Sequence, residues 1–162
     1  ELLKLSFQKV IYLGYNLVLP LIFIAAPWWQ VALGFCAMHF TCGLILALIF
    51  QPAHVVEMTE FPKPVAESMA MEDDWASHQM KTTANFAPKN WLLSWFVGGL
   101  NFQVEHHLFP NICHVHYKKI APIIKETAKE FNLPYHSKST FIGAVITNAK
   151  LLYQLGRQPQ MA

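Results

Sequence analysis

The chain has 162 residues, of which 54% are hydrophobic and 14% are charged, and its mean hydropathy is +0.28. Soluble domains average about 25% charged residues, so this composition excludes a disordered chain and argues against an ordinary soluble globule. The net charge of +2 is too small to indicate nucleic-acid binding. The chain has three cysteines, which is an odd number, so we expect no disulfide framework and a reducing compartment.

Two membrane-spanning helices are predicted near the start of the chain. No charged residue occurs from Val10 to Phe50, and this run is long enough for two helices of about 20 residues each. Pro27 interrupts the run, since proline removes a helical hydrogen bond. We therefore predict one span at Val10–Ala26 and a second at Gln30–Phe50.

The distribution of charge predicts the orientation of this hairpin. Lys4 and Lys9 precede the first span, and most other charged residues follow the second. Residues 1–9 are therefore expected to be a cytosolic lead-in, with both chain ends in the cytoplasm and the turn at Pro27 outside. Two alternatives are a cleaved signal peptide and a buried hairpin of a soluble protein. A second apolar run follows the first at once, and neither run carries a charge, which argues against both.

Residues 51–162 are expected to form a cytosolic cap made of helices. Residues 51–90 read as loop and short helix, and the apolar segment Trp91–Gly99 is too short to cross a membrane. Val115–Phe131 has the apolar spacing of an amphipathic helix, and Ser139–Leu155 is predicted to be the last helix. The predicted fold class is all-α, a membrane hairpin at residues 10–50 followed by the cap.

The segment Gln103-Val104-Glu105-His106-His107 is the most informative motif. If it is helical, Gln103, His106 and His107 fall within an arc of about 100°, while Val104 and Glu105 point elsewhere. Adjacent histidines diverge by one residue step, which suits two neighbouring metal ions, and neutral imidazole is a good ligand for iron. The alternative is a pair of histidines at a membrane surface with no metal.

Residues 98–110, which read GGLNFQVEHHLFP, resemble the third histidine box of membrane fatty acid desaturases. Glutamine in the first place resembles the front-end subgroup (delta-5/delta-6, linoleoyl-CoA desaturase-like), and residues 50–57, 74–79, 82–86 and 114–117 resemble the same subgroup. The resemblance implies four membrane helices under a cytosolic helical cap. It also implies a di-iron site that uses O2 and two electrons to introduce a cis double bond into an acyl chain.

One departure from that family is large. The family has two earlier histidine boxes, of the forms HxxxH and HxxHH, and neither pattern occurs in this sequence. We therefore expect the chain to be the C-terminal half of a desaturase, with a missing N-terminal half that carries the first two boxes. The two predicted spans would then be the third and fourth membrane helices of the whole enzyme.

The resemblance implies the metal ligands. His54 follows the last span at the position of an isolated family ligand, and His106 and His107 are ligands from the box. Gln103 is expected to be a weak ligand or to hold a water on the metal, and His78 and Asn101 are further candidates for contacts at or near the metal. For His78, a role in helix packing or hydrogen bonding is an equal alternative. We expect no catalytic residue beyond these ligands and no residue that binds another cofactor.

The remaining histidines are expected to lie outside the site. His39 precedes His54 by 15 positions, or about 22 Å along a continuous helix, so both cannot bind one di-iron site. His39 is instead expected to form a hydrogen bond within the helical bundle. His114 and His116 alternate as on an extended segment, and they are expected either at the surface or behind the metal ligands. His136 is expected to be exposed to solvent.

The predicted function is that of the C-terminal part of an integral membrane desaturase, with its metal site on the cytoplasmic side. Its cofactors would be two iron ions, with O2 as co-substrate. Its partners would be membrane lipid, a fatty acyl substrate as acyl-CoA or acyl-lipid, and an electron donor such as cytochrome b5 or ferredoxin. The alternatives are a hydroxylase or other oxygenase of the same di-iron superfamily, and a non-catalytic membrane fragment.

Overall fold

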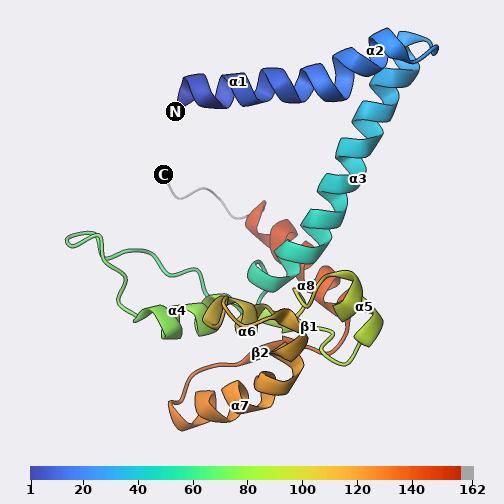
Figure 1. Cartoon of the computed structure of the whole chain (residues 1–162). Coiled ribbons are helices and arrows are strands. Elements are labelled where there is room, and N and C mark those ends of the chain that lie inside the picture. Colours follow the sequence, from blue (N-terminus) through green and yellow to red (C-terminus); the bar gives the residue numbers. More distant parts are fainter. Residues whose placement is uncertain (158–162) are drawn as a thin grey trace. The chain divides into compact units, whose positions relative to one another are not determined.

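The structure is a computed structural model that describes residues 1–157. It is mostly helical, and it divides into a first unit, Glu1–Leu46, and a second unit that begins at Ala47 (Figure 1). The helix α3, Trp28–His54, begins in the first unit and ends in the second.

Two helices in the structure are long and apolar enough to cross a membrane, by length and composition. The first runs over Leu2–Phe23 with a mean hydropathy of 1.3, and the second is α3 with 2.1. The first contains α1, Leu2–Leu13, a π-helical segment at Gly14–Val18, and α2, Leu19–Phe23. It begins at Leu2 rather than at Val10, because the first residues contain no helix breaker and simply add turns at its N-terminus.

The predicted break between the two helices is confirmed. The backbone becomes extended at Ile24, and α3 begins directly after Pro27. His39 also forms the predicted hydrogen bond within this unit, since its Nε2 lies 2.8 Å from the Tyr12 hydroxyl. The Phe35 ring packs edge-on against His39, with 4.4 Å between ring centroids.

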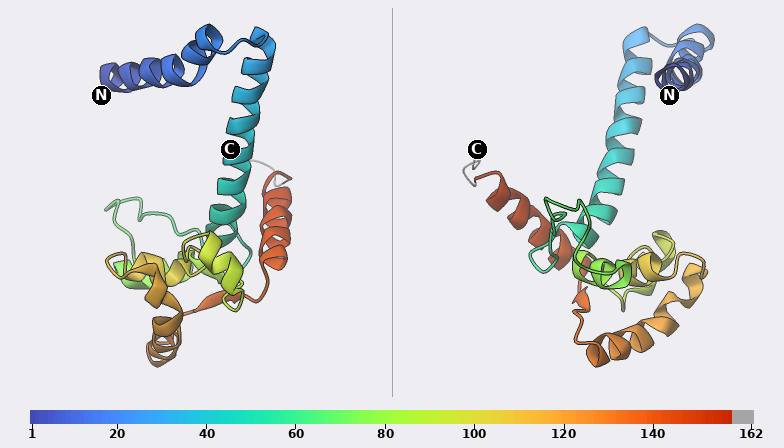
Figure 2. Two further views of the ribbon diagram at one scale, coloured as in Figure 1. Left: turned by 45° about the vertical axis from the view of Figure 1, so that its right-hand side comes forward. Right: turned by 90° about the vertical axis from the view of Figure 1, so that its left-hand side faces the viewer.

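The second unit contains the end of α3 and seven further helices and strands, in addition to a short 3-10 turn. In chain order these are α4, Trp75–Thr82; β1, Ala84–Phe86; α5, Trp91–Phe96; α6, Gln103–Leu108; α7, Tyr117–Glu130; β2, His136–Lys138; and α8, Phe141–Leu155. The chain passes from α7 through the orange-red strand β2 to α8 (Figure 2). The predicted helices at 115–131 and 139–155 therefore form, each with a slightly later start.

The prediction of an all-α fold is wrong in one respect, because β1 and β2 form a two-stranded parallel sheet. Ala84 pairs with His136, and Phe86 pairs with Lys138. All three residues of β1 are buried, and the sequence Ala84-Asn85-Phe86 alternates apolar and polar residues. Three residues are too few to establish a period, which explains why the sequence did not predict this strand.

Two small hydrophobic cores hold the second unit together. One joins Ala53 near the end of α3 to Phe86 and Ala87 at β1 and to Ala144 of α8. The other joins Met80 of α4, Val104 of α6 and the apolar face of α7. Because Val104 is fully buried, α6 is anchored to α4 and α7 through its side chain.

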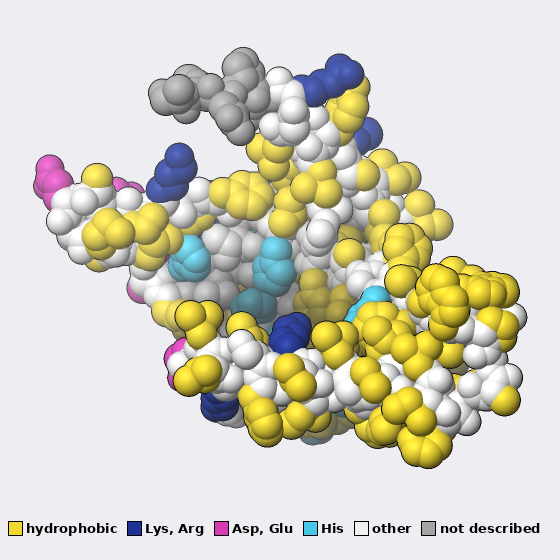
Figure 3. Space-filling model, turned by 90° about the horizontal axis from the view of Figure 1, so that it is seen from above, with side chains coloured by type: hydrophobic (Ala, Val, Ile, Leu, Met, Phe, Trp, Pro, Cys, Tyr) yellow, Lys and Arg dark blue, Asp and Glu magenta, His cyan; other side chains and the backbone are white. Residues whose placement is uncertain are grey.

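Much of the apolar surface is not covered. Hydrophobic side chains dominate the face shown in Figure 3, where charged side chains are few. In the second unit the indole rings of Trp91 and Trp95 are 73% and 76% exposed on α5. Exposure of apolar side chains on this scale is typical of surfaces that contact lipid or another protein segment.

A turn at Gly98 and Gly99 connects α5 to the segment before α6. Both residues have positive φ angles, of 59° and 75°. A Cβ atom on Gly99 would lie 2.9 Å from the Cβ of His114, whereas a Cβ on Gly98 would meet no atom within 4 Å. The turn therefore needs glycine twice for its backbone, and at Gly99 also for the close approach of the chain after α6.

We expect Gly99→Ala to destabilise the protein more than Gly98→Ala. Gly98→Ala adds only the cost of a left-handed alanine, about 1 kcal/mol, whereas Gly99→Ala adds a clash with His114 and should cost at least about 2 kcal/mol. Thermal unfolding of both variants in detergent, followed by circular dichroism, measures the difference. Equal midpoints for the two variants would contradict the geometry of this turn.

Candidate metal centre

The helix α6 carries the motif that the sequence analysis singled out. It covers Gln103–Leu108, so the helical form assumed for the motif is confirmed. Gln103, Val104 and Glu105 are buried, while His106 and His107 are half-buried. The two histidine rings are therefore the part of the motif that is open to a ligand.

The fold brings His54 to the histidine pair. The ring centroids of His54 and His107 are 4.9 Å apart, and those of His106 and His107 are 5.7 Å apart. His54 belongs to the last turn of α3, and the core around Ala53 fixes that turn within the second unit. His54 thus forms one cluster with a histidine pair that is distant from it in sequence. No group of three His, Cys, Asp or Glu side chains in residues 1–157, however, has the geometry to hold a metal ion.

Burial sets the protonation state of His107. Burial, together with the smaller effect of the positive charges of protonated His54 and His106, lowers the pKa of His107 to about 4. The imidazole of His107 is therefore neutral at neutral pH. A neutral ring is the form that binds a metal ion, so no proton has to leave before binding.

Tyr117 orients the His106 ring. Its hydroxyl lies 3.2 Å from Nδ1 of His106, and the tyrosine is almost fully buried against Gly99. The other ring nitrogen of His106, Nε2, forms no hydrogen bond within residues 1–157 and could bind a ligand. Hydrogen bonds of this kind are typical behind histidine ligands, because they fix the ring and its tautomer. The sequence pattern does not predict this role of Tyr117, for which the signal is the family resemblance at residues 114–117.

A buried carboxylate lies beside the histidine pair. Glu105 has no exposed surface, and its Oε1 accepts a hydrogen bond of 2.6 Å from the Tyr135 hydroxyl. Its Oε2 accepts a second bond of 2.8 Å from Nδ2 of Asn85, whose Oδ1 accepts the Val104 backbone N–H at 2.9 Å. Burial raises the pKa of Glu105 and also that of Tyr135, while the two hydrogen bonds act to lower the pKa of Glu105.

Gln103 and Asn101 are both buried, and each has a polar atom without a partner. Nε2 of Gln103 and Oδ1 of Asn101 have no hydrogen-bond partner among the described residues. Asn101 still donates through Nδ2 to the Ser94 hydroxyl at 3.0 Å, whereas the structure records no hydrogen bond of the Gln103 side chain. A buried donor without a partner is costly, so the unpaired Nε2 of Gln103, three positions before His106 on α6, fits a ligand with an acceptor atom, such as a water bound to a metal.

These residues fit part of an iron centre. Neutral imidazoles and an amide oxygen suit iron, and His54, His106, His107 and Gln103 supply such groups on neighbouring elements. His78 lies on α4, which packs against α6, and its buried Nδ1 has no partner among the described residues. Two iron ions need more ligands than this set provides, so the residues present fit one part of a di-iron site.

The expectations for the other histidines need correction. His136 was expected to be exposed, but it lies half-buried in β2, where burial lowers its pKa. His114 and His116 were expected on an extended segment, but they form an exposed 3-10 turn before α7. The unpredicted strand β2 explains the first error, and the proximity of the α7 N-terminus explains the second.

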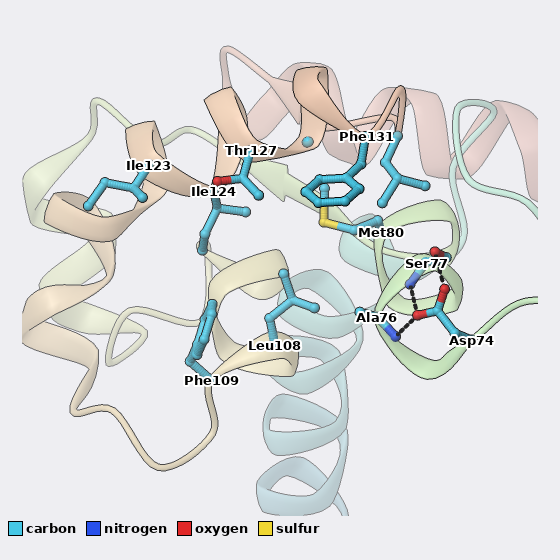
Figure 4. A pocket seen from close by; sticks show the side chains of 12 residues that line it. Asp74, Ala76, Ser77, Met80, Leu108, Phe109, Ile123, Ile124, Thr127 and Phe131 are labelled. Carbon is cyan, nitrogen blue, oxygen red and sulfur yellow. Dashed lines mark hydrogen bonds between the residues drawn. The ribbon is translucent and has the colours of Figure 1, made fainter.

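An apolar cavity of about 440 Å3 lies against the far end of α6. Leu108 and Phe109 line it together with residues of α4 and α7, including Met80 and Ile124 (Figure 4). At its rim, Asp74 accepts hydrogen bonds from the backbone N–H groups of Ala76 and Ser77 and so caps α4. The segment after the histidine pair therefore forms an apolar wall.

The family model for fatty acid desaturases matches residues 4–139. The chain is similar to the sn-1 linoleoyl-lipid 6-desaturase of Synechocystis, with 44% identity over 97% of this chain and 44% of that protein. It is also similar to the enzyme of the same name from Arthrospira platensis, with 43% identity over 81% of this chain and 35% of that protein. The acyl-lipid (8-3)-desaturase of Mortierella alpina is 38% identical over 94% of this chain and 33% of its own length.

The chain thus spans less than half the length of these relatives. No solved structure matches it. The family match covers most of the sequence, including His54, the whole of α6 and both strands. From this match and the similarity to front-end desaturases, we conclude that the chain belongs to the fatty acid desaturase family.

Proposed function

We propose that this chain forms part of an acyl-lipid desaturase that introduces a cis double bond into a fatty acyl chain. The observation that carries the proposal is the cluster of His54, His106 and His107, which joins the end of an apolar helix to the histidine box. The names of the relatives support an acyl chain held on a lipid as the substrate.

The chemistry explains why the site would need metal. Two iron ions with O2 supply the oxidant for removing two hydrogens from an unactivated methylene, which no side chain can do. The residues of this chain would contribute neutral imidazoles from His54, His106 and His107, with the Gln103 amide beside them. Tyr117 would hold the His106 ring in place, and the apolar segment after the box would keep water away from the site.

The membrane setting belongs to the same proposal. The helices Leu2–Phe23 and Trp28–His54 would cross the bilayer, with both ends and the histidine cluster on the cytoplasmic side. An N-terminal half with the first two histidine boxes would supply the remaining ligands. Cytochrome b5 or a ferredoxin would supply the electrons.

A chimera tests the proposed function directly. We expect activity when this chain replaces the 158 matched residues of the Synechocystis desaturase, in cells that lack their own 6-desaturase. Gas chromatography of the membrane lipids should show a linoleoyl product with one additional cis double bond. A chimera that is present in membranes with iron at the parent level but forms no such product would overturn the proposal, and a hydroxylated product would indicate an oxygenase instead.

His107→Ala in this chimera should lower product formation by more than about 100-fold, beyond the range typical of losing a residue behind a ligand. The matched control is His116→Ala, because His116 is an exposed histidine on the turn before α7. That variant should keep most of the activity. Product per milligram of membrane protein measures both, and similar activity in the two variants would refute the ligand assignment.

Gln103 should show intermediate behaviour. Gln103→Ala removes an amide beside the ligands, so iron content and product should fall by about 10- to 100-fold and stay above those of His107→Ala. Gln103→His offers an imidazole on the same face of α6 and should retain iron even if product is lost. Iron per protein, measured together with product, distinguishes the cases, and wild-type iron and activity in Gln103→Ala would make the residue purely structural.

A further inference from the structure

We propose that Glu105 is a positioning residue, and that Asn85 and Tyr135 hold it so that α6 presents His106 and His107 to the metal site. This inference rests on the proposed function, because the positioning matters only if those histidines bind iron. It gives a role to Glu105 within the histidine motif and adds two residues from outside it, Asn85 and Tyr135.

The helix α6 cannot fix its own orientation. It has only six residues, and no side chain caps its N-terminus at Phe102. Isolated helices of this length are unstable in water, so their form and rotation come from contacts with the rest of the protein. The apolar contact of Val104 anchors the helix, but such contacts tolerate rotation more readily than directed hydrogen bonds do.

The network around Glu105 supplies directed contacts from two strands. Asn85 lies in the middle of β1, and Tyr135 comes directly before β2. The pairing of the two strands brings these side chains together, and Nδ2 of Asn85 lies 2.8 Å from the Tyr135 hydroxyl. Both oxygens of Glu105 are thus held by side chains on one small sheet.

Asn85 holds α6 at two points. Its Nδ2 donates to the Glu105 side chain at 2.8 Å, and its Oδ1 accepts the backbone N–H of Val104 at 2.9 Å. One bond fixes the backbone of the first turn, and the other fixes a side chain one residue later. Together they define the rotation of the helix about its axis as well as its position.

The rotation of α6 determines where the histidines point. Glu105 immediately precedes His106, and successive residues differ by about 100° around a helix. If Glu105 turned away from Asn85 and Tyr135, His106 and His107 would swing with it. Bonds between metal and imidazole nitrogen tolerate only about 0.2 Å of displacement, so a small rotation would break them.

The free-energy cost of burying Glu105 supports a role for it in positioning α6. Glu105 has no exposed surface, and a carboxylate is expensive to bury compared with an apolar residue of similar size. Packing alone would therefore favour a leucine or methionine at this place. Buried polar groups that fix one arrangement among several are a known reason for accepting such a cost.

A polarity swap tests the network in the active chimera. Asn85→Asp places a carboxylate against Glu105, so it should lower product per bound iron by at least about 10-fold. Adding Glu105→Gln should restore activity to within about threefold of the unmutated chimera. In the double variant the new glutamine amide donates to the new aspartate carboxylate, while the Val104 N–H and the Tyr135 hydroxyl keep their acceptors. Glu105→Gln alone should be milder, because a rotated amide still accepts from Asn85 and only the Tyr135 proton loses its acceptor.

Mössbauer spectra of the bound iron distinguish a role in positioning the histidines from a role in the stability of the fold alone. We expect altered spectra in Asn85→Asp and spectra like those of the unmutated chimera in the double variant, with folded fractions compared by thermal unfolding. Thr147→Val is the matched control, since it removes another buried side-chain hydrogen bond, within α8. It should leave spectrum and activity unchanged.

Each outcome of these experiments decides either the proposed function or the positioning role of Glu105. If the unmutated chimera binds iron but is inactive, the proposed function fails. If it is active and Asn85→Asp keeps the spectrum and the activity, or the folded double variant restores neither, the positioning role is overturned. Should Asn85→Asp fail to fold, Tyr135→Phe decides instead: it removes the 2.6 Å bond to Glu105 and should change the spectrum, and an unchanged spectrum would reject the inference.

Discussion

The parallel pairing of β1 with β2 is the constraint on which the second unit depends. Only three residues on each strand take part, yet the pair closes a loop that contains α5, α6 and α7. Asn85 and Tyr135 meet across this pair, and Phe86 contributes from it to the core that holds the end of α3. The positions of the α6 histidines and of His54 at the end of α3 therefore depend on the same small sheet.

The site combines apolar surroundings with polar groups that have specific partners. Burial keeps His107 neutral, which favours metal binding, and the same burial raises the pKa of Glu105. The protein compensates by giving Glu105 two hydrogen-bond donors and His106 a tyrosine hydroxyl. Gln103 differs from these groups, since its buried amide nitrogen is unpaired among the described residues.

The sequence predicted the parts of the structure that have strong local signals. The charge-free run indicated two apolar helices, the spacing of apolar residues indicated α7, and the histidine motif indicated α6. It did not predict the short strands, because three residues are too few to establish a period. It also missed Glu105, Asn85 and Tyr135, since their roles arise from contacts between residues 20 to 50 positions apart. His136 was misplaced for the same reason.

The position of Tyr135 has a consequence for how the protein is made. During synthesis α6 leaves the ribosome well before residues 135–138, so the partners that orient it are at first absent. Forming contacts across such a separation requires closing a long loop, which is slower than forming local helices. The final orientation of the histidine box therefore depends on contacts that can form only after β2 has been synthesised. Under the proposed function, iron would enter an ordered site only after that step.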